Sequence, residues 1–562
     1  MKVKFFLIII LAVFLRIYQL DKIPPSLFSD EVDIGYHVFS ILKTARDYNG
    51  NFLPVHFQSE ADFRAPLYIY SSIPTIALFG LNEWGVRLPA AIFGVFSIIG
   101  IYFLSKKLIN NDKIALIAAF LLTISPWHLH YSRAAFEVTL MMALLVWGTY
   151  FFLNGIKKVG YFIISAVFLS LAIYSYSPAK LFIPVFIAGL IIIYKDSLFR
   201  LKTSFKVLLI IILIVVNVPM ILEIKNGQAG YRFSYTSIFF DPTISKEIDN
   251  NRLIDSKKDS TSVGVEADLT SKISHNKLLS FSDAFLKNYL YPYSTNFLFL
   301  QGDYIGRHSV GKMGQFYLVE FVTIILGIFY LFKTARRKSI YLLLFWLFTA
   351  PIPAALTVGG GGHATRLFLM LTPITVLSSL GIYSLLTNLP GLGRLKKLLL
   401  FSLAVLFLVN IYIYFHRYYL HYSAEQERLW HFGFKQAITK SEVLKGNFDK
   451  VVLTTTTEPP LLFLLFWTKF DPLTFQKEST EKVNLEGFGS DIHKIGKYYL
   501  ASLEPNLDKD KINESILPGM LVIANRKDIS PDLRREQIKG IKLVDMVEYP
   551  SGEVAFYLLT HE

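Results

Sequence analysis

The stretch VRLPAAIFGVFSIIGIYFLS, residues 86–105, contains one charged side chain and is followed directly by Lys106 and Lys107. A helix needs about 20 predominantly apolar residues to cross the ~30 Å hydrocarbon core of a bilayer. Comparable charge-poor stretches lie at about residues 5–20, 114–131, 134–154, 160–175, 181–194, 207–222, 316–332, 340–357, 366–387 and 398–415. The sequence therefore predicts an all-α polytopic membrane protein with about eleven spanning helices and further juxtamembrane helices.

The composition points to the same class of protein. Of the 562 residues, 53% belong to the AVILMFWYC set and 18% are charged, whereas a soluble domain carries about 25% charge. This composition excludes a disordered chain, a collagen and a disulfide scaffold. With no cysteine in the sequence, a thiol nucleophile and a cysteine-ligated metal are excluded as well.

The net charge of +14 is explained by where the cations lie. When residues 67–81 are treated as interfacial, every basic cluster falls on one side of the membrane: Lys2/Lys4, Lys106/Lys107/Lys113, Lys157/Lys158, Lys195/Arg200/Lys202/Lys206, Lys333/Arg336/Arg337/Lys338 and Arg394/Lys396/Lys397. The short loops on the other side hold only isolated cations, Arg133, Lys180 and Arg366. By the positive-inside rule the N-terminus is cytoplasmic. We expect a multi-pass protein of the cytoplasmic (plasma) membrane. The basic residues thus set orientation, and no nucleic-acid partner is expected.

Three segments then lie outside the cytoplasm. We expect a membrane domain at residues 1–415, with outer loops at 21–81 and 223–315, and an extracytoplasmic domain at 416–562. The last segment has the pattern of a small α/β domain. Its predicted elements are strands at 451–455, 520–524, 541–549 and 554–560 and a buried helix at 460–470.

The first outer loop contains Phe28-Ser29-Asp30-Glu31 at the end of the first spanning helix. One interpretation is structural: Ser29 caps a helix, and the two carboxylates favour its positive end. The other is catalytic, because a carboxylate held at the membrane edge can act as a general base on a hydroxyl. The residues alone leave both open.

The second outer loop offers Arg133 and Glu137, four residues apart at the start of a helix. They could form a simple i,i+4 ion pair. Alternatively, Glu137 faces the same cavity as Asp30, since ionisable groups at this depth are costly and often functional. A metal role for His128 and His130 has only weak support, because their spacing does not suit one helical face.

Two further loops each supply one cation. Lys180 follows Tyr176-Ser177-Pro178-Ala179, and Arg366 follows the glycines at 359–362 and His363. Snorkelling to lipid headgroups would explain such residues. An Arg and a Lys that converge from separate loops would instead suit a phosphate.

Residues 306–312 resemble a nucleotide P-loop, but Met313 replaces the required Ser/Thr and the segment lies on the outer side. Arg307 and His308 within it remain candidates for lining a site.

Read in order, these segments resemble the GT-C fold integral-membrane glycosyltransferases of the protein O-mannosyltransferase and aminoarabinose transferase branch. The resemblance begins at Asp30-Glu31 together with residues 87–94. It is strengthened by Arg64-Ala65-Pro66-Leu67-Tyr68 and by the segments 131–137, 176–180 and 363–366. It covers roughly residues 1–390, and the tail is similar to the extracytoplasmic domain of bacterial members.

This resemblance implies a polyprenyl-phosphate-linked sugar donor, in contact with membrane lipid, and transfer outside the cytoplasm, usually with inversion. The acceptor would be a hydroxyl or amine of a protein, lipid or glycan. The implied roles are a base or acceptor-positioning carboxylate at Asp30, with support from Glu31 and Glu137. Lys180 and Arg366 would bind the departing phosphate, and Arg64 and His363 are further candidates for binding it. Other cavity candidates are Arg133, Tyr176, Arg307 and His308.

One departure concerns metal. Aminoarabinose-transferase-type members carry Glu-Lys-Pro where this chain has Arg64-Ala65-Pro66, so the metal ligand implied there is in doubt. A divalent metal is an open expectation, and no cofactor is assigned.

The rival function is a polytopic lipid or oligosaccharide transporter or flippase. Such a protein would show inverted repeats or helices broken at mid-membrane depth. Here the candidate charges gather in outer loops, which favours an enzyme. A scaffold that displays the tail domain would leave the Asp30-Glu31 pair unexplained.

Overall fold

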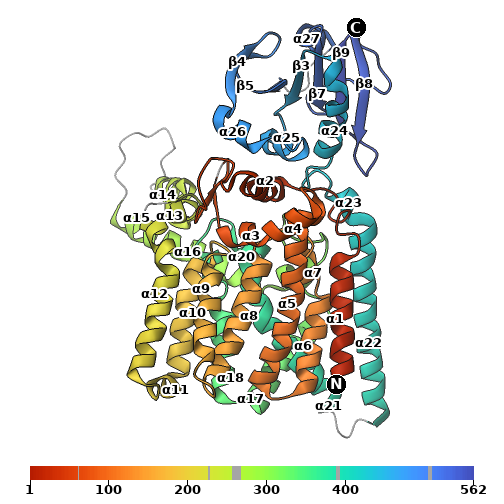
Figure 1. The fold of residues 1–562 in the computed structure, drawn as a ribbon. Helices are drawn as coiled ribbons and strands as arrows, with labels where there is room; N and C mark the ends of the chain where they lie inside the picture. The colour runs from red at the N-terminus through yellow and green to blue at the C-terminus, as the bar shows by residue number, and fades with distance from the viewer. Residues whose placement is uncertain (61, 226–227, 256–267, 388–392, 504–508) are drawn as a thin grey trace.

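The computed structural model describes residues 1–60, 62–225, 228–255, 268–387, 393–503 and 509–562. A bundle of long helices forms its lower part, and a domain with a β-sheet forms its upper part (Figure 1). Helix α2 (Ser29–Thr44) lies across the end of the bundle between the two. The predicted fold class, a helical membrane protein with a small α/β C-terminal domain, is confirmed. The domain boundary at residue 415 stays a prediction; α22 ends at His416.

The helices of the bundle follow the predicted apolar stretches in order. They are α1 (Lys2–Ile17), α5 (Glu83–Ile109), α6 (Asp112–Ile124), α8 (Val138–Gly155), α9 (Tyr161–Ile173), α10 (Ala179–Ile193), α12 (Thr203–Lys225), α17 (Glu320–Thr334), α18 (Arg337–Thr349), α21 (Leu371–Thr387) and α22 (Gly393–His416). Within the described residues, 6 helical stretches are long and apolar enough to cross a membrane. The count of about eleven spans therefore stays a prediction.

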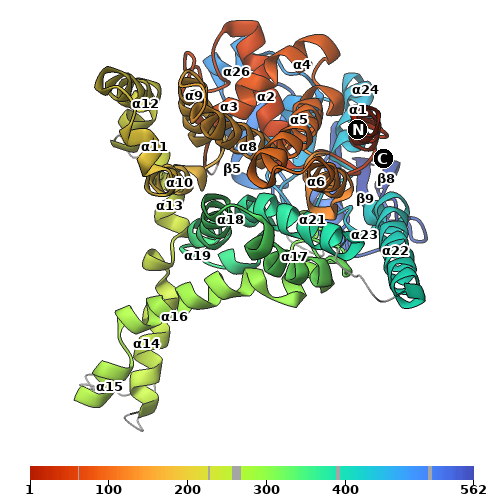
Figure 2. The same cartoon turned by 90° about the horizontal axis from the view of Figure 1, so that it is seen from below.

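Two helices show that the bundle is surrounded by lipid. α12 and α22 stand at separate edges of the bundle (Figure 2). The most apolar window in the α12 stretch has a mean hydropathy of 2.9, and that in the α22 stretch has 2.4; only 6% of each window is buried by the protein. A helix that is apolar all round and yet uncovered is stable only in an apolar solvent. The chain is a multi-pass membrane protein.

One predicted span is interrupted. The stretch 114–131 divides into α6, which ends at Ile124, and α7 (Pro126–Tyr131). Ser125 lies between them, and its side chain accepts a hydrogen bond from the backbone N–H of His128. A proline at the first helical position and a serine cap are typical of a new helix start. Hydropathy alone therefore overestimated the length of this span.

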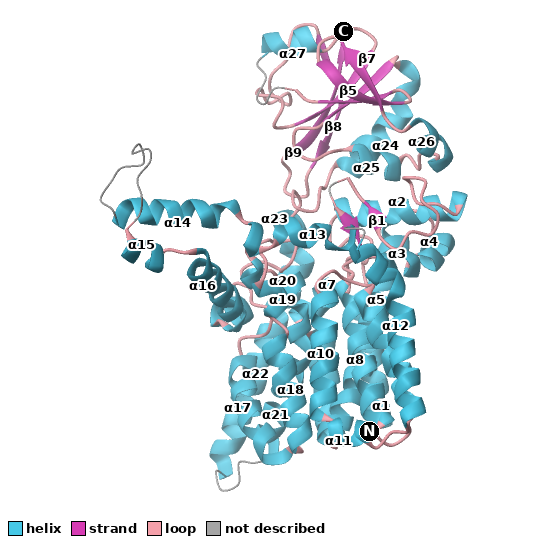
Figure 3. Cartoon of the chain, turned by 90° about the vertical axis from the view of Figure 1, so that its left-hand side faces the viewer, coloured by secondary structure: helices cyan, strands magenta, loops and turns pink. Residues whose placement is uncertain are grey.

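The ambiguous stretch 67–81 forms two short helices, α3 (Pro66–Ser71) and α4 (Ile73–Phe79), at the outer end of the bundle. Neither is long enough to cross a bilayer. The outer loop after α12 forms an arm that projects sideways (Figures 2 and 3). Its helices are α13 (Gln228–Thr236), α14 (Pro242–Asp255), α15 (Leu269–Ser274) and α16 (Lys277–Leu290).

The C-terminal domain contains a sheet of 7 strands in the order β4-β5-β6-β3-β7-β9-β8. The predicted strands are confirmed as β3 (Lys450–Thr454), β7 (Met520–Asn525), β8 (Ile541–Glu548) and β9 (Val554–His561). The sequence analysis missed β4 (Glu481–Leu485), β5 (Gly489–Ile495) and β6 (Tyr498–Ala501). The β4–β5 edge is mostly solvated and rich in charge, as edge strands often are, so it lacks the apolar pattern of a buried strand.

The C-terminal domain packs directly on α2 through α25 (Leu461–Trp467) and α26 (Pro472–Glu478). Gly35 lies against the ring of Phe466, which a Cβ at that position would approach to 2.3 Å. The Tyr36 hydroxyl donates to the carbonyl of Phe470 at 3.1 Å, and the amide of Gln476 donates to the carbonyl of Asp47 at 2.8 Å. The C-terminal domain therefore packs against the helix that carries Asp30 and helps to hold it in place.

The predicted orientation can be tested because the native chain has no cysteine. We expect Asn51→Cys and Lys497→Cys to react with a membrane-impermeant maleimide in intact cells. Both residues are exposed, and both lie in segments assigned to the outer side. Lys158→Cys, exposed in the α8–α9 loop, should react only after permeabilisation. Labelling of Lys158→Cys in intact cells, or protection of Asn51→Cys, would reverse the assignment.

Candidate active site

Helix α2 is positioned by a buried ion pair between Glu31 and Arg87 of α5. Arg87 donates from Nε to Glu31 Oε1 and from Nη2 to Oε2, each at 2.9 Å. Glu31 also accepts the backbone N–H of Ala135 at 2.9 Å and that of Phe28 at 3.4 Å. Both side chains of the pair are 0% exposed. Glu31 is thus fully used in holding the first turn of α2 on α5 and on the loop after α7.

In the same region, the buried side chain of Arg133 binds backbone carbonyl groups. Its guanidinium donates to the carbonyls of Leu15, Gln19 and Ile23 at 2.7, 3.1 and 3.0 Å. Arg133 is 0% exposed, and its guanidinium is directed at the chain that links α1 to α2. The alternative of an ion pair with Glu137 is not seen among the described contacts. Arg133, predicted as a cavity residue, supports the loop that leads to α2.

Asp30 has a different environment from its neighbour Glu31. Its side chain is 48% exposed, and Oδ1 accepts a hydrogen bond from Arg64 Nη2 at 2.8 Å. Arg64 also pairs with Asp33. Partial burial alone would raise the pKa of Asp30, but Arg64, Arg307 and Arg232 outweigh it and hold the pKa well below its usual range. Asp30 is therefore an ionised, accessible carboxylate at neutral pH.

Helix α2 begins at Ser29, so Ser29 is its first residue and Phe28 occupies the cap position. The prediction of Ser29 as the cap is wrong, because Glu31 supplies the contact to the Phe28 N–H instead. The Ser29 side chain lies close enough to Glu458 of the C-terminal domain to lower the pKa of that carboxyl, against the larger effect of burial.

Glu137 lies at the N-terminal end of α8 and interacts electrostatically with Asp30. Its carboxylate has no hydrogen-bond or ion-pair partner in the described part of the chain. Burial raises its pKa to about 7, while Arg64 and Arg232 oppose the shift and Asp30 adds to it. Asp30 and Glu137 thus interact electrostatically, and the expectation that they face one cavity stays a prediction. Their pKa values are driven apart, which is typical of acid–base pairs in active sites.

Three cations line one cavity of about 430 Å³, and one of them, Arg232, interacts electrostatically with both carboxylates. Lys180 and Arg366 were predicted to converge, and both line it. The third is Arg232 of α13, which the sequence analysis missed. The cavity is otherwise lined mainly by apolar residues, among them Leu181, Ile224, Phe233, Pro353 and Leu356.

Each cation in the cavity has a neighbour that fixes its position. Arg366 donates to Thr357 Oγ1 at 2.6 Å and to the carbonyl of Val358 at 3.2 Å. Arg232 Nη1 lies 3.2 Å from Asp62 Oδ2. Lys180 Nζ lies 3.0 Å from His56 Nε2. Tyr176 also lines this cavity, and burial raises the pKa of its phenol to about 12, so it is a neutral hydrogen-bond donor.

Arg64 and His363 are placed elsewhere. Arg64 is held between Asp30 and Asp33, at the position where the resemblance implied a metal-ligating Glu. A guanidinium cannot ligate a metal, so that metal site does not fit this chain. His363 stacks against His308, with ring centroids 4.6 Å apart. Burial, aided by His308 and Arg366, lowers the pKa of His363 to about 2, which keeps it neutral.

The loop that carries Arg307 and His308 covers the same region from another side. The Arg307 guanidinium lies 4.5 Å from the centroid of the Phe28 ring, beside the start of α2. His308 Nδ1 lies 3.2 Å from Asp303 Oδ2. Asp303, His308 and His363 form a group in which one ligand atom from each lies within 4.8 Å of the others. These residues could hold a metal ion.

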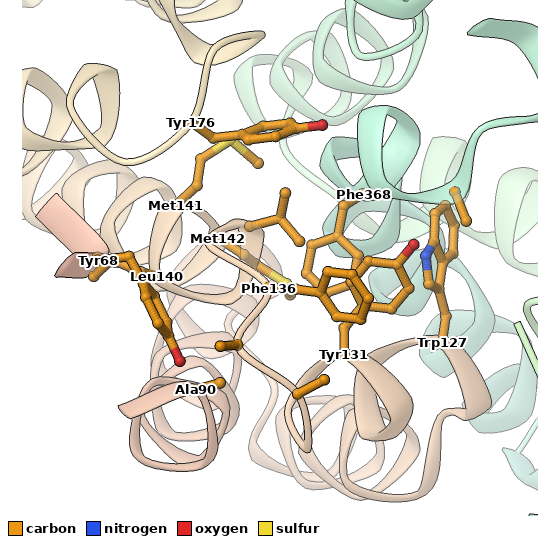
Figure 4. Packing of buried hydrophobic residues seen from close by; sticks show 14 of the residues in the cluster. Tyr68, Ala90, Trp127, Tyr131, Phe136, Leu140, Met141, Met142, Tyr176 and Phe368 are labelled. Carbon is orange, nitrogen blue, oxygen red and sulfur yellow. The ribbon is translucent and has the colours of Figure 1, made fainter. Parts of the chain in front are cut away.

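His128 and His130, weakly predicted as metal ligands, have separate partners. His128 Nδ1 lies 2.7 Å from Arg16 Nη2, and His130 Nε2 lies 2.8 Å from the carbonyl of Arg307. Beside them, aromatic rings fill the core between the bundle helices (Figure 4). Tyr131 packs with its centroid 4.5 Å from Phe136 and 5.0 Å from Phe368. This aromatic cluster gives the loops of the site a rigid base.

The C-terminal domain also reaches the site, which the sequence did not indicate. Glu458, in the segment after β3, interacts electrostatically with Arg307 and Asp30. His431 Nε2 lies 3.7 Å from Glu458 Oε2. Burial raises the pKa of Glu458 and lowers that of His431 to about 4. The ionisable groups of the site thus come from both domains.

The comparisons with known proteins agree with this architecture. Residues 64–222 match the family model described as dolichyl-phosphate-mannose-protein mannosyltransferase. The structure is similar to ArnT from Cupriavidus metallidurans bound to undecaprenyl phosphate, with a TM-score of 0.52 and 11% identity over 99% of this chain and 97% of that chain. An oligosaccharyltransferase from Archaeoglobus fulgidus gives a TM-score of 0.48 and 14% identity over 82% of this chain and 61% of that chain. No curated protein matches the sequence.

The resemblance to GT-C membrane glycosyltransferases of the protein mannosyltransferase and ArnT type is thereby confirmed. The match to ArnT supports the fold, and the family match covers the segment that carries Arg64, Glu137 and Lys180. Together these findings show the fold of the chain and a segment of mannosyltransferase type at residues 64–222.

The buried pair can be tested by removing one partner. We expect Arg87→Leu to lower the free energy of unfolding by about 3–5 kcal/mol, because it leaves the Glu31 charge buried and unpaired. Thermal unfolding in detergent, followed by tryptophan fluorescence, measures the effect. The control is Arg534→Leu, which removes the partner of Asp532 in a solvated pair and should leave the midpoint near that of the parent. Equal midpoints for both variants would contradict the role given to Arg87.

Proposed function

We propose that this chain transfers a sugar from a polyprenyl-phosphate donor to a hydroxyl or amine of a protein, lipid or glycan acceptor, on the extracytoplasmic side and with inversion. The observation that supports this most is that an accessible carboxylate, Asp30, interacts electrostatically with Arg232, one of three cations that line a mainly apolar cavity. The carboxylate suits the attacking acceptor, and the cationic cavity suits a lipid phosphate.

The donor site is proposed in the cavity between α10, α13 and the loop before α21. A polyprenyl phosphate has an apolar chain and an anionic head, and the cavity offers apolar walls with Lys180, Arg232 and Arg366. Arginine binds phosphate through its planar fork and lysine as a point charge. The similarity in fold to ArnT bound to undecaprenyl phosphate is consistent with a donor of this class.

In the proposed reaction the acceptor oxygen or nitrogen attacks the anomeric carbon of the donor sugar. The bond from that carbon to the phosphate oxygen breaks, and the lipid phosphate departs with the electron pair. The three cations stabilise the negative charge that develops on this leaving group. Attack on the face opposite the phosphate gives inversion.

The acceptor must be held in position and must lose one proton. The two carboxylates suit these two different roles. Asp30 is accessible but has a pKa far below neutrality, so it positions the acceptor by accepting its hydrogen bond. Glu137, with a pKa of about 7, is matched to receive the proton at neutral pH, since efficient general bases have a pKa near the working pH. Glu31 acts on the reaction only by holding α2 in place.

Removal of the Asp30 charge tests the mechanism. We expect Asp30→Asn to lower turnover by about 10²-fold, because the acceptor is no longer held in position for attack, measured as transfer of radiolabelled sugar from polyprenyl-phosphate donors in proteoliposomes. Asp283→Asn is the matched control, because Asp283 is exposed on the arm and forms an ion pair with its exposed neighbour Lys287. If Asp30→Asn retains the turnover of the control, the proposed mechanism is wrong even where transfer itself is observed.

The cation that the sequence analysis missed gives a second test. We expect Arg232→Gln to raise the KM for the donor about 10- to 100-fold, since a hydrogen bond to a charged group contributes about 1.5–3 kcal/mol. The acceptor KM should stay unchanged. Arg428→Gln, in an exposed pair with Glu553, is the control. A donor KM for Arg232→Gln equal to that of Arg428→Gln would remove Arg232 from the donor site.

A further inference from the structure

The group formed by Asp303, His308 and His363 joins two segments that are far apart in the sequence. Asp303 and His308 lie at the end of the outer loop 223–315, and His363 follows the glycines that precede α20 (Ala364–Leu367). Asp303 is 4% exposed and His308 is 8% exposed. Burial of an Asp and two imidazoles together needs a compensating interaction.

The distances suit a metal ion. His308 Nδ1 and Asp303 Oδ2 are 3.2 Å apart, and two ligands about 2.0–2.1 Å from a tetrahedral zinc are roughly 3.4 Å apart. The ligand atom of His363 lies within 4.8 Å of both, a gap that rotation of its ring can close. His363 Nδ1 is buried and has no hydrogen-bond partner in the described part of the chain.

The surroundings of Asp303 resemble the outer shell of a metal ligand. The backbone N–H of Ile305 donates to Asp303 Oδ1 at 2.8 Å, and that of Ala364 donates to Oδ2 at 2.7 Å. Such hydrogen bonds fix the orientation of a ligating carboxylate. An ion pair between His308 and Asp303 would explain this contact alone, but it gives no partner to His363.

We propose that Asp303, His308 and His363 bind one zinc ion. Two imidazoles and a carboxylate are a ligand set that zinc accepts, and a water completes the tetrahedron. The ion fastens the end of the outer loop to the segment before α20. Arg307 directly precedes one ligand, and Arg366 follows another by three residues, so the ion also fixes the position of these two cations.

Zinc content of the full-length protein tests this inference independently of sugar transfer. We expect the parent, purified in detergent, incubated with zinc and desalted, to retain about one zinc per chain by elemental analysis. His363→Ala and Asp303→Asn should retain almost none, and only the parent should gain thermal stability from added zinc. His275→Ala is the control, because His275 forms a two-residue contact with Asp255 at 3.0 Å in the same outer loop; it should bind like the parent.

Two results would overturn the proposal. One is a parent protein that retains no more zinc than His363→Ala. The other is a His363→Ala variant that elutes as the parent does in gel filtration and still holds one zinc. Asp303→Asn keeps the shape of the side chain and the N–H contact at one oxygen, so its zinc content decides the matter where the alanine variant fails to fold.

Discussion

The buried contact between Glu31 and Arg87 is the constraint on which the site depends. Two charges removed from water are tolerated only when their hydrogen bonds are satisfied. Here Arg87 uses Nε, Nη1 and Nη2 on Glu31 and on the carbonyls of Leu20, Pro24 and Ser26. One guanidinium therefore fixes the end of the α1–α2 connection and the first turn of α2 at once. Asp30, which directly precedes Glu31 and has an exposed side chain, is positioned by the same contact.

Adjacent carboxylates thus have opposite tasks. Successive residues on a helix point about 100° apart, so when Glu31 faces α5, Asp30 faces outward to Arg64. Burial of Glu31 fixes the helix, and exposure of Asp30 leaves one carboxylate free to meet a ligand. The C-terminal domain reinforces this arrangement, because α25 and α26 cover the opposite side of α2 and bring Glu458 to its first turn.

The sequence analysis predicted features that follow from local composition and missed those that depend on distant partners. Lipid demands long apolar helices, and a buried strand demands an apolar run, so the bundle and the strands β3, β7, β8 and β9 could be predicted. Lys180 and Arg366 were found because cations are rare in the short outer loops. Arg232 escaped notice in a polar loop, although the apolar span before it and Phe233 after it were a usable signal. The different roles of Asp30 and Glu31 could not be read, since their partners lie 34 and 56 residues away.

The position of α12 has a consequence for how the proposed enzyme would meet its donor. This helix leans on α9 with little of its surface covered, and its last turn supplies Ile224 to the wall of the cationic cavity. One wall of the cavity therefore comes from a weakly packed helix at the edge of the bundle. A donor that arrives sideways through this wall never leaves the membrane, so its availability is set by its mole fraction among lipids. The rate of transfer would then depend on the surface density of the donor in the membrane. Dilution of the donor with other lipids would lower this rate, whereas the volume of the surrounding water would not change it.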